Sequence, residues 1–414
     1  MLIGAAAPAT PRYREKREAI LSAAALLFNE HGLRGATLAD IAGSVGLVTN
    51  SVTYYYRKKE DLASACLLRS IAAFEAVALT AAAHADVPER VRAFFRGHAQ
   101  LLAAIEDGTH APLIVFNDIR ALPEPQTAVV FAAYTAMFKR VRALLKGPQT
   151  ALLERDDLNA RAHIVLSIAN WMGPWIGRYE PAEYARVADR VSDILIRGIA
   201  GAGAVWSPPE DDAVWHPTRD VDSPSEAFLR AATVLVNEQG YRGASIDKIS
   251  ARLNVTKGSF YHHNDNKLDL IAACFERSFA VMRQALVRAE ASPGSGWSRA
   301  CAAACALVRF QLSTEGPLLR ATATSALPDH AQREQVRATL RRLTERMTSV
   351  VVDGMVDGSV RPLDPAVAAQ IAVATINAAA ELQRWVPGVK PSVAADLYVR
   401  AAFEGLLCPG VAQR

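Results

Sequence analysis

The chain has few cysteines, little net charge and no long apolar run. Each of these shortages argues against a class of protein. Five cysteines in 414 residues, an odd number without metal-ligand spacing, indicate a reducing compartment. The net charge of +4 is too small to indicate a nucleic-acid binder by itself. No uninterrupted apolar run reaches the ~20 residues of a membrane span, and the Ala-rich start lacks the features of a signal peptide. We therefore expect a cytoplasmic protein with no membrane partner.

Apolar residues are plentiful and mostly aliphatic. They make up 51% of the chain, rich in Ala, Leu and Val, and charges of both signs are interspersed among them. This composition is enough for a packed, mostly helical core. The length allows two to four domains.

The stretch from 37 to 62, TLADIAGSVGLVTNSVTYYYRKKEDL, predicts two short helices joined by a tight turn. Thr37 and Asp40 have the spacing of a capping box at a helix start. Gly46 stands where that helix should end with a positive φ. A second helix is expected from about 49 to 56. This spacing is typical of a helix-turn-helix, whose second helix enters the major groove of DNA.

The same stretch occurs again 208 positions later. Gly46 then pairs with Asn254, the other residue that tolerates the left-handed conformation. One helix-turn-helix pattern is a weak signal, but two ungapped copies indicate an internal duplication. From Glu18/Glu226 to Cys66/Cys274 no gap is needed, and identical pairs include Gly32 with Gly240, Gly35 with Gly243, Ile41 with Ile249 and Ser51 with Ser259.

Both copies resemble the N-terminal domain of the TetR family of repressors. The first carries Arg-Gly-Ala-Thr, the helix-turn-helix, a Tyr-rich second helix and Lys-Glu-Asp-Leu in the family's order. The second, GYRGASIDKISARLNVTKGSFYHHNDNKLDLI, is more similar still. The resemblance implies an all-α protein in which each DNA-binding head sits on a helical bundle that binds a ligand and dimerises.

Helical periods and Pro or Gly breaks divide the chain into five expected parts. The Pro-, Gly- and Asp-rich linker contains Trp206 and Trp215, which suggests that it is held against the surface. The parts are a first head at 11–66, a first bundle at 67–203, the linker at 204–222, a second head at 223–274 and a second bundle at 275–414.

The last helices of the two bundles are expected to pack against each other. We predict this contact between 160–178 with 182–200 on one side and about 365–386 with 393–407 on the other. The short tether favours folding of one chain onto itself, so a single chain is expected to act as a pseudo-dimer. Further dimerisation stays open.

The candidate DNA-binding residues lie on the two recognition helices. In the second copy the family-matching positions are Thr256, Lys257, Gly258, Ser259, Tyr261 and His262, and Lys267 stands where the family places a phosphate contact. The first copy departs from this pattern, so it either reads different bases or has lost DNA binding. Its equivalents are Val48, Thr49, Asn50, Ser51, Thr53, Tyr54 and Lys59.

A basic cluster precedes the first head. Arg12, Arg14, Lys16 and Arg17 form either a solvated helix end or an arm that contacts phosphates. The adjacent helix-turn-helix favours the arm.

Aromatic side chains gather in the first bundle, where they form either ordinary core or a pocket for a small, mostly apolar effector. The Ala-rich second bundle is expected to stay empty, and no cofactor is expected. Cys301 and Cys305, at i and i+4, fit buried small residues better than metal ligands. The candidate effector residues are Phe94, His98, Phe116, Asn117, Phe131, Tyr134, Asn170, Trp171 and Trp175.

These patterns favour a ligand-responsive transcriptional regulator, a repressor by the family's usual mode, on a double-stranded operator with two unlike half-sites. The alternative is a helical scaffold that binds small molecules or partners while one or both heads are inactive. An enzyme is disfavoured, because the sequence has no nucleophile elbow, phosphate loop or acid pair at a telling spacing.

Overall fold

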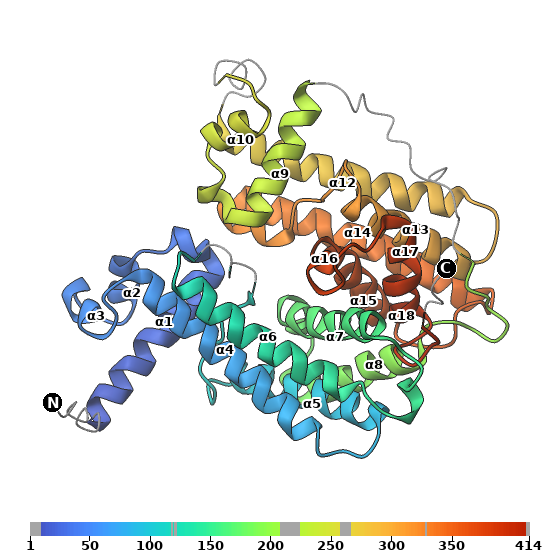
Figure 1. Ribbon diagram of the computed structural model, residues 1–414, viewed down its shortest axis with the longest axis horizontal. Helices are drawn as coiled ribbons and strands as arrows, with labels where there is room; N and C mark the ends of the chain where they lie inside the picture. The colour runs from blue at the N-terminus through green and yellow to red at the C-terminus, as the bar shows by residue number, and fades with distance from the viewer. Residues whose placement is uncertain are drawn as a thin grey trace.

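The chain folds into two helical units that lie side by side (Figure 1). The computed structural model describes residues 10–116, 119, 122–207, 224–256, 266–327 and 329–410. Within these ranges the chain forms helices and turns, with one isolated antiparallel bridge between Ala200 and Val360. The expected all-α fold is confirmed.

The first unit follows the predicted order of helices. The helices expected at 160–178 and 182–200 are present as α7 and α8 and differ from expectation by a few residues at their ends. The elements are α1 (Pro11–Gly35), α2 (Leu38–Ser44), α3 (Thr49–Tyr55), α4 (Lys59–Ala81), α5 (Val87–Glu106), α6 (Gln126–Leu144), η2 (Pro148–Thr150), α7 (Arg155–Ile176), η3 (Pro181–Glu183) and α8 (Tyr184–Arg197).

The second unit repeats this order with shorter final helices. The elements are α9 (Pro224–Gly243), α10 (Ile246–Arg252), α12 (Lys267–Ala291), α13 (Gly296–Leu312), η5 (Ala321–Ala326), α14 (His330–Val356), α15 (Pro365–Ala378), η6 (Ala379–Glu381), α16 (Leu382–Trp385), α17 (Pro391–Ala394), η7 (Ala395–Val399) and α18 (Arg400–Phe403).

The two continuous helices expected over 365–386 and 393–407 are each interrupted. The first changes to a 3₁₀ turn at η6, and the second to a π turn at η7. Both interruptions pack against α13, and η7 also packs against α7. Tertiary packing therefore outweighs the Ala-rich helix propensity at these points.

Local signals read from the sequence set the ends of the head helices. The Thr37 side chain accepts a hydrogen bond from the Asp40 amide at 3.1 Å, and the Asp40 carboxylate accepts one from the Thr37 amide at 3.0 Å. These carboxylate contacts lower the pKa of Asp40. Gly46 has a φ of +66°, and Asn254 has a φ of +56°. The predicted capping box and both predicted turn residues are confirmed.

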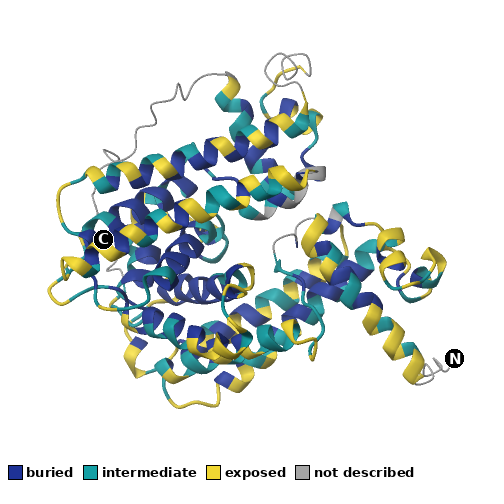
Figure 2. Cartoon of the chain, turned by 180° about the vertical axis from the view of Figure 1, so that it is seen from behind, coloured by how far each residue is buried: buried dark blue, intermediate teal, exposed yellow. Residues whose placement is uncertain are grey.

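The two units meet through their last helices, as the sequence predicts. α7 packs against α15, α16 and η7, and α8 packs against α15 and α18. Most residues of α7 are buried, and the buried helices lie at the centre of the molecule, where the units join (Figure 2). Side chains also bond across this contact: the Trp171 indole N–H donates to the Gln370 side chain at 3.0 Å, and the Asn159 amide donates to the Trp385 carbonyl at 2.8 Å.

A backbone crossing lies at the end of α8 and α18. Gly198 and Gly405 both have positive φ, +70° and +104°. The Ile199 amide donates to the Phe403 carbonyl, and the Leu406 amide donates to the Leu195 carbonyl, both at 2.7 Å. The two chain segments approach so closely because neither glycine carries a Cβ atom.

A buried arginine completes this contact. Arg161 in α7 is only 2% exposed and pairs with Asp157, one turn earlier, at 3.2 Å. Its guanidinium also donates to the carbonyl oxygens of Leu406 and Cys408 in the second unit, each at 3.0 Å. Because its charge and its donors are satisfied, this arginine can be buried between the units.

The start of the expected linker lies on the second unit. The Trp206 indole N–H donates to the Asp396 carboxylate at 2.6 Å, and the Trp297 indole N–H donates to the Val205 carbonyl at 3.0 Å. Trp206 is therefore held at the surface as expected. Trp215 and the rest of the expected linker, from 208 on, lie outside the described residues.

Two helices are long and apolar enough to cross a membrane by length and composition alone, although charged residues interrupt both. They are Lys59–Ala81 and Pro365–Trp385, and 50% and 67% of their most apolar windows are buried inside the protein. Core helices pass the same test, so this finding is weak evidence for a membrane span.

Replacing Gly198 or Gly405 with Ala should force the crossing apart. A Cβ at Gly198 would lie 2.4 Å from the backbone of the second unit, and one at Gly405 would lie 2.5 Å from the backbone of the first. With the left-handed strain added, we expect each substitution to lower the free energy of unfolding by roughly 2–5 kcal/mol, measured by urea titration of the full chain.

Gly108→Ala is the matched control. Gly108 has a φ of +73°, but nothing lies within 4 Å of its Cβ position. Only the backbone strain of about 1–2 kcal/mol should therefore remain. Equal losses in the control and in Gly198→Ala would show that the close approach contributes nothing.

Candidate nucleic-acid interface and effector site

The recognition helix of the first head turns its predicted face to solvent. Val48 is 69% exposed and Tyr54 is 74% exposed, which is unusual for side chains of this size. Thr49 and Asn50 are also exposed, while Ser51 and Thr53 are half-buried. Val52, between them in sequence, is fully buried and fixes the helix to the head. Of the predicted residues of the first copy, four are thus exposed at α3, two are half-buried there, and Lys59 lies at the start of α4.

The basic start of α1 lies beside this helix. The Tyr13 ring lies 4.8 Å from the Tyr55 ring, and the Arg17 guanidinium lies 5.6 Å from the centre of the Tyr56 ring. These contacts fix the first turns of α1 against the end of α3. An open hollow of about 350 Å³ lies between the two helices, lined by Lys16, Leu47, Asn50, Ser51, Tyr54 and Tyr55.

Part of the second recognition face is described. Thr256 is exposed, and Lys267 begins α12, whose N-cap is Asn266. The predicted residues Lys257, Gly258, Ser259, Tyr261 and His262 lie outside the described residues.

Lys59 and Lys267 begin equivalent helices, α4 and α12. The Lys59 ammonium donates to the Ala36 carbonyl at 3.1 Å, which links the start of α4 to the end of α1. The expected phosphate contact of both lysines stays a prediction.

Comparison with known families identifies both heads. The family of bacterial regulatory proteins named for tetR matches at residues 20–66 and again at 228–274, which are the two helix-turn-helix heads. The chain is a tandem TetR-family protein. The duplication read from the sequence is confirmed, because the same family pattern occurs at both places.

Two curated relatives match short parts of this TetR-family protein. The transposon Tn10 TetC protein of Escherichia coli is 36% identical over 83 residues, which cover 20% of this chain and 42% of the relative. The IcaR protein of Staphylococcus epidermidis, a negative regulator of the biofilm operon icaADBC, is 37% identical over 63 residues, which cover 15% of this chain and 34% of the relative. The chain thus spans less than half the length of either.

Solved structures of similar proteins cover about one unit. The TetR-family regulator PfmR of Thermus thermophilus is 24% identical, with a TM-score of 0.35 over 45% of this chain and 95% of PfmR. AibR, solved with isovaleryl coenzyme A and operator DNA, is 22% identical, with a TM-score of 0.33 over 41% of this chain and 94% of AibR.

An aromatic row crosses the first bundle and includes several predicted effector residues. The His98 and Phe74 rings lie 4.6 Å apart, Phe74 and Phe116 lie 5.1 Å apart, and Phe116 and Tyr134 lie 5.4 Å apart. The Phe116 amide also points to the Asn170 side-chain oxygen at 3.5 Å. The structure thus brings these four predicted residues together around Phe74.

The second unit covers the end of this row. The Trp385 ring stacks on Phe138 with 3.5 Å between centroids, and it lies 6.0 Å from Tyr134. The Arg384 guanidinium lies 4.1 Å from the centre of the Phe131 ring. Phe131 and Tyr134 therefore lie at the contact between units as well as in the predicted effector group.

Two predicted effector residues each have one buried polar atom without a hydrogen-bond partner within the described part of the chain: Nδ1 of His98, which belongs to the row, and Nε1 of Trp175, whose ring contacts Tyr179. His98 Nε2 lies 2.8 Å from the Ala169 carbonyl, which can only accept, so Nε2 carries the proton and Nδ1 is an acceptor. Burial lowers the pKa of His98 to about 4, so the ring is neutral at pH 7. A buried acceptor and a buried donor without partners fit polar groups of a bound molecule.

The remaining predicted effector residues lie apart from the row. Phe94 is fully buried against Phe95, 5.5 Å away, and Trp171 bonds to Gln370 of the second unit. Asn117 lies outside the described residues.

Cys301 and Cys305 are buried in α13, and burial raises the pKa of Cys305 to about 12.

The sequence did not point to two neighbours of these sites. Tyr13 belongs to the basic cluster, but its packing on α3 has no local signal. Trp385 reaches the first bundle from more than two hundred positions away, so no periodicity within one unit indicates it. A Trp on the short helix α16 is the single sequence cue for that contact.

The two buried histidines predict a specific pH dependence of stability. Burial lowers the pKa of His98 and of His163 to about 4, against an ordinary value of 6.5. Between pH 6.5 and 4 the unfolded chain therefore binds up to two protons that the folded chain does not. The stabilisation of the folded chain that the two neutral rings provide is full above pH 6.5. It is lost as the pH falls towards 4, by up to ~1.4 kcal/mol per pH unit for each ring.

Urea unfolding across this pH range measures the effect. His98→Phe should reduce the slope of unfolding free energy against pH by about one proton. His31→Phe is the control for the loss of a histidine that is not buried, because the His31 side chain is 41% exposed. An unaltered slope in His98→Phe would rule out a neutral buried ring.

Proposed function

We propose that the protein is a ligand-responsive transcriptional regulator, with repression as its expected mode, and that one chain acts as a pseudo-dimer on double-stranded DNA. The observation that carries this proposal is the presence of two TetR-type heads in one chain, at 20–66 and 228–274. The exposed polar and aromatic face of α3 supports DNA contact by the first head. The similarity to IcaR supports a regulatory role.

The surface around the first recognition helix supports a phosphate-binding role for the start of α1. Lys16 lines the hollow beside Asn50 and Ser51, and Arg12 and Arg14 lie on the same exposed turns. Guanidinium and ammonium groups beside a recognition helix supply the sequence-independent part of DNA affinity. This surface favours an active first head over one retained only for packing.

The packing between the units supports the pseudo-dimer. The helices that meet, α7 with α8 and α15 with α18, are the last long elements of each unit. The satisfied backbone and arginine contacts at Gly198, Gly405 and Arg161 leave little reason for these surfaces to separate. We therefore propose two heads carried by one rigid pair of bundles, each head on its own unit as the expected division at 11–66, 67–203, 223–274 and 275–414 has it.

We place the effector in the first bundle. The support is the aromatic row from His98 to Tyr134 and the two buried polar atoms without partners. A mostly apolar molecule that carries a hydrogen-bond donor for His98 Nδ1 fits this surrounding. Its binding would change the fraction of chains whose heads fit adjacent turns of DNA.

The operator should have two unlike half-sites. The recognition residues of the two copies differ, and the heads of a pseudo-dimer read sites one turn of duplex apart, ~34–36 Å. We expect a mobility shift with the DNA that flanks the gene, and a footprint on an imperfect palindrome, at one chain per operator. A perfect palindrome, or light scattering that shows an obligate dimer of chains, would contradict the proposal.

Substitutions in the two heads should have different effects. Asn50→Ala should change base preference in one half-site, because an exposed amide at this position can pair with a base edge. Lys267→Ala should weaken binding to all sequences and reduce the salt dependence by about one phosphate contact. Fluorescence anisotropy with duplexes that vary each half-site measures both, and Leu152→Ala, 96% exposed on the first bundle, should change neither.

A further inference from the structure

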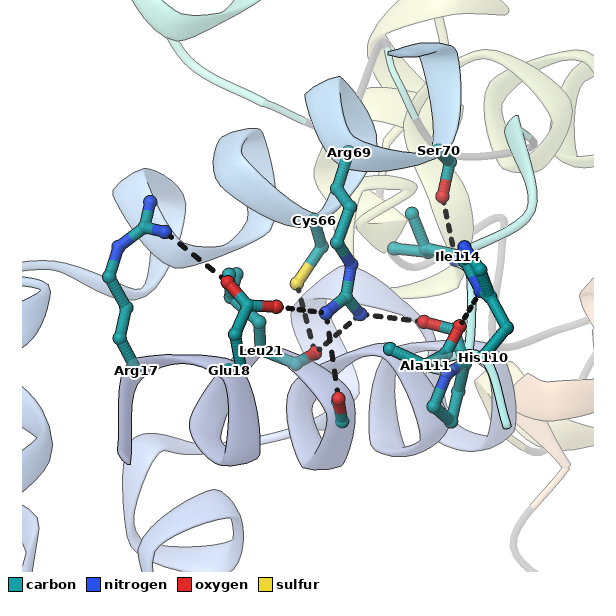
Figure 3. A network of polar contacts seen from close by, with 11 residues as sticks. Arg17, Glu18, Leu21, Cys66, Arg69, Ser70, His110, Ala111 and Ile114 are labelled. Atoms are coloured by element: carbon teal, nitrogen blue, oxygen red, sulfur yellow. Dashed lines mark hydrogen bonds and ion pairs between the residues drawn. The ribbon is translucent and has the colours of Figure 1, made fainter. Parts of the chain in front are cut away.

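The same polar contacts hold each head to its own bundle. In the first unit a non-helical segment, 112–116, follows α5 and lies against α1 and α4 (Figure 3). In the second unit the segment 317–321 follows α13 and lies against α9 and α12. We call these the first and second link segments. They end at Phe116 and Ala321 respectively.

Three side chains hold the first link segment: Asn29 from α1 in the first head, and Arg69 and Ser70 from α4, the helix that runs from this head into the first bundle. The Asn29 amide donates to the Leu113 carbonyl at 2.8 Å, and its oxygen accepts from the Val115 amide at 3.0 Å. The Ser70 hydroxyl accepts from the Ile114 amide at 2.9 Å. Arg69 donates to the Pro112 carbonyl at 2.6 Å and also to Glu18 at 3.3 Å. Four successive residues, Pro112 to Val115, thus each have one backbone group bonded to a side chain of α1 or α4.

The second head uses the same residue types at positions shifted by 208. The Asn237 amide donates to the Leu318 carbonyl at 2.8 Å, and its oxygen accepts from the Arg320 amide at 3.1 Å. The Ser278 hydroxyl accepts from the Leu319 amide at 2.8 Å. Arg277 donates to the Pro317 carbonyl at 3.4 Å, and also to the Glu315 carbonyl just before the segment at 2.6 Å, and it pairs with Glu226.

The two link segments differ where they enter their bundles. In the first, the Phe116 ring lies in the aromatic row, and its amide makes only a long contact of 3.5 Å with Asn170. In the second, Ala321 has no ring to insert, and Arg320 pairs with Glu381 at 2.6 Å. The Leu318 amide is also bonded to Gln311, at 2.9 Å.

These attachments have different consequences. The ion pair and the Gln311 contact fix the second link segment to polar groups of its own bundle. The first link segment instead ends in an apolar contact, whose position depends on how the aromatic row packs. A change in the row would therefore be passed to the segment that Asn29, Arg69 and Ser70 bind, whereas the second link segment carries no aromatic ring.

We propose that the first link segment couples the aromatic row of the first bundle to the first head, while the second link segment holds the second head in place. Asn29, Arg69 and Ser70 are positioning residues in this coupling. That an effector uses it rests on the proposed function. The result is a regulator in which one head is adjustable and the other serves as a fixed reference.

Hydrogen exchange of the full chain, followed by mass spectrometry, tests the coupling without DNA or effector. Phe116→Ala removes the ring that contacts Phe74 and Tyr134 in the row. We expect exchange of the amides in α2 and α3 to speed up by about tenfold, which corresponds to ~1.4 kcal/mol, while α10 is unaffected. In a chain that already carries Asn29→Ala, Phe116→Ala should raise the exchange rate of these amides by less than about twofold, because the bonds between Asn29 and the link segment are already lost.

Asn237→Ala is the matched control, since it should speed exchange in α10 and leave α2 and α3 unchanged. Asn29→Asp, which keeps the acceptor for the Val115 amide, serves if Asn29→Ala unfolds the head. Unchanged exchange in α2 and α3 upon Phe116→Ala, or an undiminished effect in the Asn29 variant, would overturn the coupling. A failure to bind DNA would instead overturn the proposed function and leave this result standing.

Discussion

The close approach of two backbones at Gly198 and Gly405 is the constraint on which the relation between the units depends. The amides of Ile199 and Leu406 cross to the opposite unit there, and Arg161 donates to two carbonyls beyond the crossing. These bonds use backbone groups that would otherwise be left unpaired at the ends of α8 and α18. The helices behind the crossing, α7 and α15, are then brought into contact along their buried faces.

Because both units belong to one chain, the contact between them does not have to bring two separate molecules together. Two separate subunits would lose translational and rotational freedom on pairing, whereas tethered units meet at an effective concentration set by the linker. The two sides of the contact are consequently free to differ. The end of α16 places Trp385 on Phe138, while the end of α7 reaches α14 through an exposed ion pair between Arg178 and Glu345.

The sequence predicted those features that depend on neighbours along the chain. The Thr37 capping box and the positive φ of Gly46 and Asn254 follow from local hydrogen bonding and from which residues tolerate the left-handed conformation. The candidate recognition face of α3 could be read in the same way. The breaks at η6 and η7, the packing of Tyr13 and the contact of Trp385 depend on surfaces from distant segments, about which periodicity carries no information. The effector residues stay a prediction for the same reason.

A comparison of the two copies distinguishes residues that the fold requires from residues that differ with the role of each unit. The residues that hold each link segment, Asn29 with Asn237 and Arg69 with Arg277, are the same in both copies and make equivalent bonds. Each satisfies backbone groups that any head on any bundle would leave unpaired. The copies diverge at the recognition helices and at Phe116 and Ala321. The divergence therefore lies on the surfaces through which a regulator would read DNA and sense a ligand.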